Sequence, residues 1–196
     1  MKRIAGVLLC GALVLALASP AGASTFLRVG PEKLAAQADS VVQGRVLEVS
    51  SFWNREGTAI LTEATFEVED TVLGPDRSHL RLVTFGGEVG GLVIEAHGFP
   101  TFRAGQRLLL FLEKVRANED GAHRVLGYRQ GEFEIRIDRL GREIAVPTWE
   151  ADNVRILKAD GTEASVPLPV LLDEFKDQIR DSAARAGRPE ANRQVP

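Results

Sequence analysis

Cysteine is almost absent from this sequence. The 196 residues include one, Cys10, which lies in an apolar N-terminal segment that we expect to be removed. The chain that remains has no thiol, which excludes an internal disulfide. Exported domains often need disulfides when their cores are too small. With 173 of the 196 residues remaining, this chain is long enough to bury an adequate core without them.

Histidine is scarce too, and no metal-binding spacing links the three that are present. They are His79, His97 and His123, and the one suggestive neighbour is Glu95, which shares a face of an expected strand with His97. A zinc site needs three or four ligands that converge. We therefore expect histidines that face water in loops or at edges, with no metal and no cofactor.

A dense basic face is missing as well. Removal of Lys2 and Arg3 with the N-terminal segment leaves 22 of the 24 basic residues against 27 acidic ones, a net charge of −5. The two signs are mixed along the chain rather than gathered in blocks. Because nucleic-acid binding needs a concentrated basic surface, the sequence predicts no nucleic-acid partner.

The N-terminus has the pattern of a cleavable signal peptide. Lys2 and Arg3 precede an apolar run from Ile4 to Ala18, and Ala21-Gly22-Ala23 follows as the small-x-small pattern that a signal peptidase recognises. We therefore expect residues 1–23 to be a signal peptide, cleavage to leave Ser24 as the new N-terminus, and the protein to be exported to the periplasm or the medium.

Two alternatives fit this segment less well. A transmembrane anchor needs roughly 20 apolar residues, and this run is shorter and ends in a cleavage pattern. A lipoprotein would carry its cysteine at the end of the run, whereas Cys10 lies in the middle. No second membrane segment follows, so we expect no stable membrane insertion after cleavage.

The rest of the chain is patterned mainly as strands. The clearest runs from Ile60 to Val72, where apolar and polar residues alternate with period two. A strand this long must bend, as strands do in small barrels, and Gly44 marks a bulge in the strand before it. Residues Gly86 to Gly91 read as a flexible glycine-rich loop. The other strands expected in this half are Val41 to Trp53, His79 to Phe85, Leu92 to Ala96, and Arg107 to Leu112, apolar on both faces.

The C-terminal half predicts a meander and a helix. Strands are expected at His123 to Tyr128, Gly131 to Asp138 and Arg142 to Val146, with an edge hairpin from Val154. In the second of these we expect one set of side chains to face the core (Phe133, Ile135, Ile137) and the other to face water (Glu132, Glu134, Arg136). Helices are expected at Pro31 to Ala38 and at Pro169 to about Ala186, where apolar residues recur at helical spacing.

These elements predict a mainly β protein: an OB-like closed or partly open β-barrel with a β-meander extension, a short N-terminal helix and one C-terminal helix. We place the barrel and meander in residues 24–166, the amphipathic helix in 167–187 and a disordered tail in 188–196.

Three segments taken together resemble a known arrangement. They are residues 38–46, the long strand that ends in Val72-Leu73-Gly74, and residues 102–112 with the run L-L-L-F-L. Their order resembles the netrin-like and tissue-inhibitor-of-metalloproteinase type of OB-fold barrel, over about residues 31–138. It is more similar still to a group of uncharacterised exported bacterial proteins, which share a Gly-x-x-Gln-Gly-x-Phe element, here Gly127, Gln130, Gly131 and Phe133.

One departure limits what this resemblance implies. The metalloproteinase inhibitors use an N-terminal cysteine to chelate the zinc of their target, whereas this chain would begin at Ser24 without any cysteine. The inhibitory chemistry therefore does not carry over, and fold by itself does not imply function.

No catalytic motif stands out. Serine, histidine and aspartate are all present, but no G-x-S-x-G elbow occurs. Glu63, Glu67 and Glu69 occupy the polar face of a strand, as alternation predicts. The glycines from Gly86 to Gly91 lack the Gly-Lys-Ser/Thr ending of a phosphate-binding loop.

Aromatic residues near strand ends are the best candidates for a site. They are Phe52, Trp53, Phe99 and Phe102, which either close the barrel ends or form a contact surface. On this basis the sequence favours a non-catalytic binding or accessory module of the bacterial envelope with an exported protein as its partner. The alternatives are a hydrolase with an unrecognised active site, or an inhibitor-like partner of an exported protease.

Overall fold

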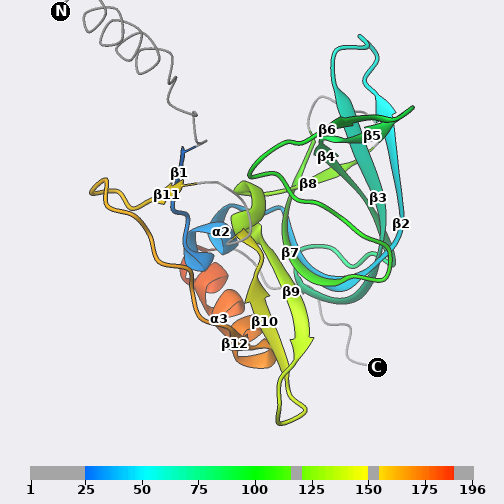
Figure 1. Ribbon diagram of the computed structural model, residues 1–196. Coiled ribbons are helices and arrows are strands. Elements are labelled where there is room, and N and C mark those ends of the chain that lie inside the picture. The colour runs from blue at the N-terminus through cyan, green and yellow to red at the C-terminus, as the bar shows by residue number, and fades with distance from the viewer. Residues whose placement is uncertain (1–24, 116–120, 150–154, 188–196) are drawn as a thin grey trace, which may run out of the picture.

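Five strands close on themselves to form a β-barrel in the computed structural model, which describes residues 25–115, 121–149 and 155–187. The order around the barrel is β2, β3, β4, β8, β7 and back to β2, and only the β4–β8 contact is parallel. This confirms the predicted closed β-barrel (Figure 1). The barrel strands are β2 (Ser40–Trp53), β3 (Ile60–Leu73), β4 (His79–Phe85), β7 (Arg107–Lys114) and β8 (His123–Val125).

The two longest strands bend where the sequence predicts. β2 and β3 have 14 residues each. Their register shifts at Gly44, where an added Cβ would lie 2.0 Å from the carbonyl oxygen of Glu67. Only glycine lets the two backbones approach this closely. The bend carries both strands around the barrel.

β7 belongs to two cores at once. Every residue from Leu108 to Leu112 has no exposed surface. Leu108, Leu110 and Leu112 face the barrel interior, whereas Leu109 and Phe111 face a second core outside the barrel. The prediction that this strand is central and apolar on both faces is confirmed, because each face is covered by a different layer.

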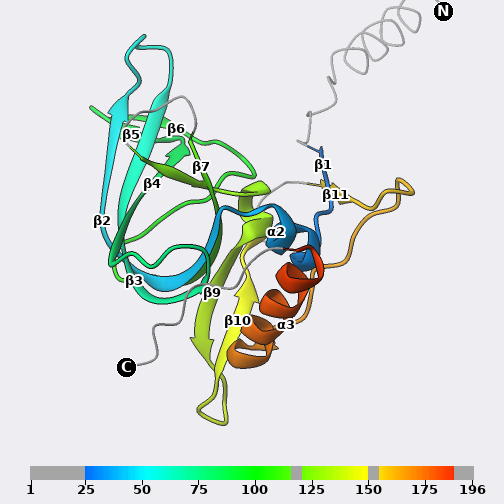
Figure 2. The ribbon, with the colours of Figure 1, turned by 180° about the vertical axis from the view of Figure 1, so that it is seen from behind.

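The second core lies between the meander and two helices. The rings of Phe111, Phe133 and Phe175 are in mutual contact there, and Lys176 forms an ion pair with Asp70 of the barrel at 2.9 Å. Figures 1 and 2 show both helices on the same side of the meander. The elements are β9 (Glu132–Ile137), β10 (Glu143–Pro147), β12 (Val170–Leu171), α2 (Pro31–Gln37) and α3 (Leu172–Arg185).

Both ends of β9 differ from the simple alternation. Glu132, expected to face water, has no exposed surface, and Ile137, expected in the core, is 60% exposed. Glu132 lies where β9 leaves the barrel beside Arg129, which provides a charged neighbour at 3.9 Å. Ile137 lies at the far end, next to the hairpin turn and Leu140. Alternation describes the middle of the strand, and the neighbouring elements decide its ends.

Three other segments differ from the predictions. Part of the expected glycine loop is a strand, β5 (Gly87–Val89), which pairs with β6 (Leu92–Ile94). The strand expected to continue to Tyr128 ends at Val125 and is followed by the short 3-10 helix η1 (Tyr128–Gly131). A strand that was not expected, β1 (Thr25–Leu27), pairs in parallel with β11 (Arg155–Leu157).

Among the described residues, no helix is long and apolar enough to cross a membrane. The expected signal peptide and the expected C-terminal tail lie outside the described residues.

Candidate functional site

Four aromatic rings form a continuous row beside one end of the barrel. The ring centroids of Phe26 and Tyr128 are 4.7 Å apart, those of Tyr128 and Phe99 are 4.9 Å apart, and those of Phe99 and Phe85 are 5.2 Å apart. Phe85 is 52% exposed and Tyr128 is 42% exposed. Rings in tilted or edge-to-face contact stabilise one another, so this aromatic row is an ordered apolar surface that faces water.

The aromatic row is assembled from distant parts of the chain, and Gln130 holds one of them. Its side-chain oxygen accepts a hydrogen bond from the Val29 N–H at 2.8 Å, and its amide donates to the Leu27 carbonyl at 3.1 Å. Gln130 is itself 6% exposed. These two bonds fix the segment that carries Phe26. The Gly-x-x-Gln-Gly-x-Phe element therefore has a structural purpose in this chain.

Tyr128 has an unusual backbone conformation. Its φ is +60°, and among the described residues it is the one non-glycine residue with positive φ. A bulky residue in the left-handed region is uncommon and costs free energy. The strain is maintained in a half-exposed residue whose ring joins Phe26 to Phe99. Such strain at a surface position indicates that the side chain is needed there.

The strand register extends this surface across the barrel. Phe52 of β2 lies opposite Leu61 of β3, and Leu61 lies opposite Phe85 of β4. Directly opposed residues on neighbouring strands point to the same face of a sheet. The structure therefore places Phe52 and Phe99, both predicted from the sequence, on one apolar surface that continues through Leu61 and Phe85.

The other two predicted residues lie elsewhere. Trp53 follows Phe52 and so faces the opposite side of β2, across from the buried Ile60, with 40% of its surface exposed. Phe102 is 7% exposed and packs in the barrel core, so it is not part of an exposed surface. Sequence reasoning missed Phe85 and Tyr128. Phe85 could have been found from the sequence, because Phe85 and Val83 are apolar residues on the face of the strand where alternation predicts polar ones.

Two hollows flank the aromatic row. Phe85, Phe99, Thr84 and Pro100 form part of the wall of both. The outer groove has a volume of about 380 Å³ and includes the ion pair between Glu113 and Arg124, 2.8 Å apart, on its far side. The mouth cavity has a volume of about 550 Å³ and lies between the end of the barrel and the segment 86–102. These volumes are in the range of small-molecule sites.

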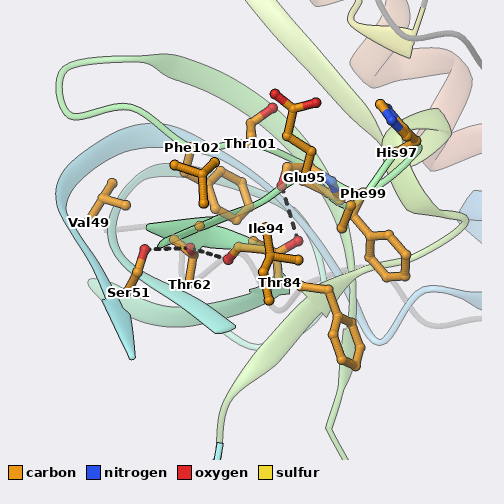
Figure 3. Close-up of a pocket in the computed structure, with 16 residues that line it drawn as sticks. Val49, Ser51, Thr62, Thr84, Ile94, Glu95, His97, Phe99, Thr101 and Phe102 are labelled. Carbon is orange, nitrogen blue, oxygen red and sulfur yellow. Dashed lines mark hydrogen bonds between the residues drawn. The ribbon is translucent and has the colours of Figure 1, made fainter. Parts of the chain in front are cut away.

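A row of three hydroxyl groups lies in the wall of the mouth cavity, across three strands (Figure 3). Ser51, Thr62 and Thr84 are register partners on the inner face of the barrel. The oxygens of Ser51 and Thr62 are 2.9 Å apart, Thr62 donates to the Gly86 carbonyl at 2.7 Å, and Thr84 donates to the Pro100 carbonyl at 3.0 Å. The hydroxyls thus attach both ends of segment 86–102 to the barrel.

This arrangement does not resemble a hydrolase nucleophile. An activated serine needs a general base within hydrogen-bond reach. The Ser51 hydroxyl is bonded to Thr62 instead, and Figure 3 shows Ser51 and His97 on opposite sides of the cavity. Glu95, the carboxylate of this cavity, is exposed. The arrangement can hold a loop and accept hydrogen bonds.

The histidines lie in three different places. His79 begins β4 on the outer face, His97 lies in the loop by the mouth cavity, and His123 is buried in β8. Burial, with smaller contributions from Arg77 and Lys114, lowers the pKa of His123. In the part of the chain that the structure describes, no group of three or more metal-ligating side chains occurs.

A cluster of charged residues lies away from the aromatic row, where the barrel meets the meander. Arg107 forms ion pairs with Glu69 at 2.7 Å and with Glu143 at 2.5 Å. The hydrogen bond from Arg107 lowers the pKa of Glu69. These groups join β3, β7 and β10, so the cluster has a structural role.

Comparison with known proteins adds no assignment to this geometry. No protein-family model matches the chain, and no curated protein matches it.

Proposed function

We propose that this protein is an exported, non-catalytic binding module of the bacterial envelope, and that it recognises a protein partner through the aromatic row. The observation that carries the proposal is the surface formed by Phe85, Phe99 and Tyr128, which are ordered by ring contacts while two of them remain about half exposed. Protein interfaces are enriched in exposed aromatic residues of this kind.

Further features support this proposal. The apolar pattern of residues 4–18 and the cleavage pattern at Ala23 support export. The net charge of −5 after cleavage disfavours nucleic acid as the partner. The five-stranded barrel is compatible with an OB-fold of the netrin-like type, in which loops and one sheet face are used for binding.

The test uses a variant that separates the backbone strain at Tyr128 from the contact that its ring makes with a partner. Tyr128→Gly removes the ring but suits the positive φ, so we expect little net change in the free energy of unfolding. The same change should weaken capture of the partner by about 1–2 kcal/mol or more. The matched control is Leu140→Ala, which truncates a side chain that is 75% exposed at the tip of the β9–β10 hairpin.

The measurement is retention of partner protein from the exported fraction on the immobilised mature domain, with thermal unfolding of each variant alongside. One protein should bind saturably to the wild type and to Leu140→Ala and be lost with Tyr128→Gly. Equal retention by a folded Tyr128→Gly variant would contradict the proposal.

One observation favours an inhibitor-like partner of an exported protease as a second candidate. Phe26 belongs to the aromatic row and lies two residues after the predicted new N-terminus. A free N-terminus would therefore lie close to the proposed surface. If inhibition uses it, adding two residues before Ser24 should abolish protease inhibition without lowering thermal stability. Unchanged inhibition by the extended protein would rule out a role for the N-terminus.

A further inference from the structure

The hydroxyl row in the mouth cavity has a fixed direction of hydrogen bonding. Each hydroxyl has one proton to donate. Thr62 donates its proton to the Gly86 carbonyl, which can only accept, so Ser51 must be the donor in the contact between Ser51 and Thr62. Thr84 donates its proton to the Pro100 carbonyl. The protons of all three hydroxyls are therefore committed to the protein.

This ordering decides what the wall offers to a ligand. The lone pairs of Ser51 and Thr84 remain as acceptors, whereas the row has no free donor. The titratable side chains in the described part of the wall are the Glu95 carboxylate, also an acceptor, and the His97 imidazole, and among the described residues the lining includes no lysine or arginine. Figure 3 shows Glu95 at the edge of the cavity and the hydroxyl row on its inner wall. Anionic ligands would meet acceptors and a negative charge.

The remaining wall is apolar. Val49, Ile94 and Phe102 line the cavity together with the ring of Phe99. Such side chains suit a short alkyl chain, and an aromatic ring beside the entrance attracts a cation. The described wall thus combines the hydroxyl acceptors, the Glu95 carboxylate, the His97 imidazole and apolar surface.

We propose that the mouth cavity binds a primary alkylammonium group. The ammonium donates its hydrogen bonds to Ser51 and Thr84, the Glu95 carboxylate at the cavity edge supplies the opposite charge, and the alkyl chain packs against the apolar wall. This chemistry has two sources, a free amine or a lysine side chain on a polypeptide. The inference goes beyond the proposed function, since an ammonium group can enter the cavity whether or not a protein contacts the aromatic row.

The experiment is an NMR titration of the mature, isotopically labelled protein with n-butylammonium, n-butanol and n-butyrate at constant pH and ionic strength. Saturable shifts of the amides of Ser51, Thr84 and Glu95 should appear with butylammonium at lower concentration than with butanol. Butyrate should produce none. Saturation by butyrate at similar concentrations, or saturable shifts confined to other parts of the chain, would overturn the proposal.

Two variants and a control locate the ammonium group. Glu95→Gln should weaken butylammonium binding about two- to fivefold, the effect of an exposed ion pair. Ser51→Ala removes one acceptor but leaves the bond from Thr62 to Gly86 in place, so the fold should persist while binding weakens. Glu88→Gln, on β5 but outside the cavity lining, should have no effect. Equal weakening by Glu88→Gln and Glu95→Gln would show only a general charge effect and overturn the site.

The two sources are distinguished by a second ligand, Nα-acetyl-lysine methylamide. Tighter binding than butylammonium indicates a lysine on a polypeptide, because the added backbone then contributes contacts. Weaker binding indicates a free amine. No saturable shift with either compound up to tens of millimolar would contradict the proposed site.

Discussion

Around Ala64 and Leu82 the inner wall of the barrel is apolar and fully buried, whereas two residues further along the same strands it becomes a row of hydroxyls. Phe66, Ala64 and Leu82 have no exposed surface and pack in the barrel core. Thr62 and Thr84 continue the same inward-facing positions, but they bond to the carbonyls of segment 86–102. The interior is thus held by packing and the mouth by a few hydrogen bonds.

This difference indicates where the molecule is free to bind. A packed interior has its atoms in contact on all sides, so a substitution there lowers the stability of the fold. At the mouth, the same strands attach a loop, border a cavity and support the aromatic row. We propose recognition at this end because the residues of the aromatic row are not part of the barrel core.

The largest expected effect tests the packed interior. Leu110 has no exposed surface and lies in the barrel core. Leu110→Ala should lower the free energy of unfolding by about 2–5 kcal/mol, because the truncated side chain would leave a cavity beside β7, the strand on which both cores depend. Chemical denaturation measures the change. A loss below about 1 kcal/mol would show that β7 is not the central strand.

A smaller effect is expected at the mouth. Thr62→Val keeps the shape but leaves the Ser51 hydroxyl and the Gly86 carbonyl without this partner, so it should cost about 1–3 kcal/mol. Hydrogen exchange should accelerate in segment 86–102 and remain unchanged in β7. The matched control is Thr65→Val on the outer face of the same strand, expected within about 0.5 kcal/mol of wild type. Equal exchange in both variants would mean that the hydroxyl row does not hold the loop.

The smallest expected effect is a pH dependence at the barrel–meander junction. Arg107 lowers the pKa of Glu69 below its usual 4.5, so the folded carboxylate contributes stability above that pH, and the contribution is lost as the pH falls through the folded pKa. At pH 7 the free energy of unfolding of the wild type should exceed that of Glu69→Gln by at most about 1 kcal/mol, since the pair is partly exposed. Denaturation curves should converge as the pH falls below about 4.5. A gap that stays constant with pH would exclude this ion pair as its cause.

Most of the barrel was predictable because its strands follow simple patterns. The alternation of β3 and the apolar run of β7 each describe side chains whose neighbours are regular sheet. The predictions were less accurate where contacts with distant segments of the chain determine the local structure. Glu132 is buried beside Arg129, and β5 pairs with β6 although its sequence is rich in glycine. No local pattern encodes such contacts.

The candidate site was predictable only in part. Phe52 and Phe99 were found because aromatic residues near strand ends are conspicuous, but the link between them through Leu61 and Phe85 depends on strand register. Phe102 fulfils the same sequence criterion and is buried. The positive φ of Tyr128 and the anchoring of β1 by Gln130 have no signal in the sequence.

We propose above all that the aromatic row contacts a protein partner in the place where the protein acts. Photo-crosslinking measures this most directly, with benzoylphenylalanine in place of Phe85 in one strain and of Leu140 in another, both half or more exposed in the structure. We expect one discrete cross-linked protein at position 85, competed by excess wild-type domain but not by the Tyr128→Gly variant, and none at position 140. No cross-link at position 85, or the same products at both positions, would contradict it.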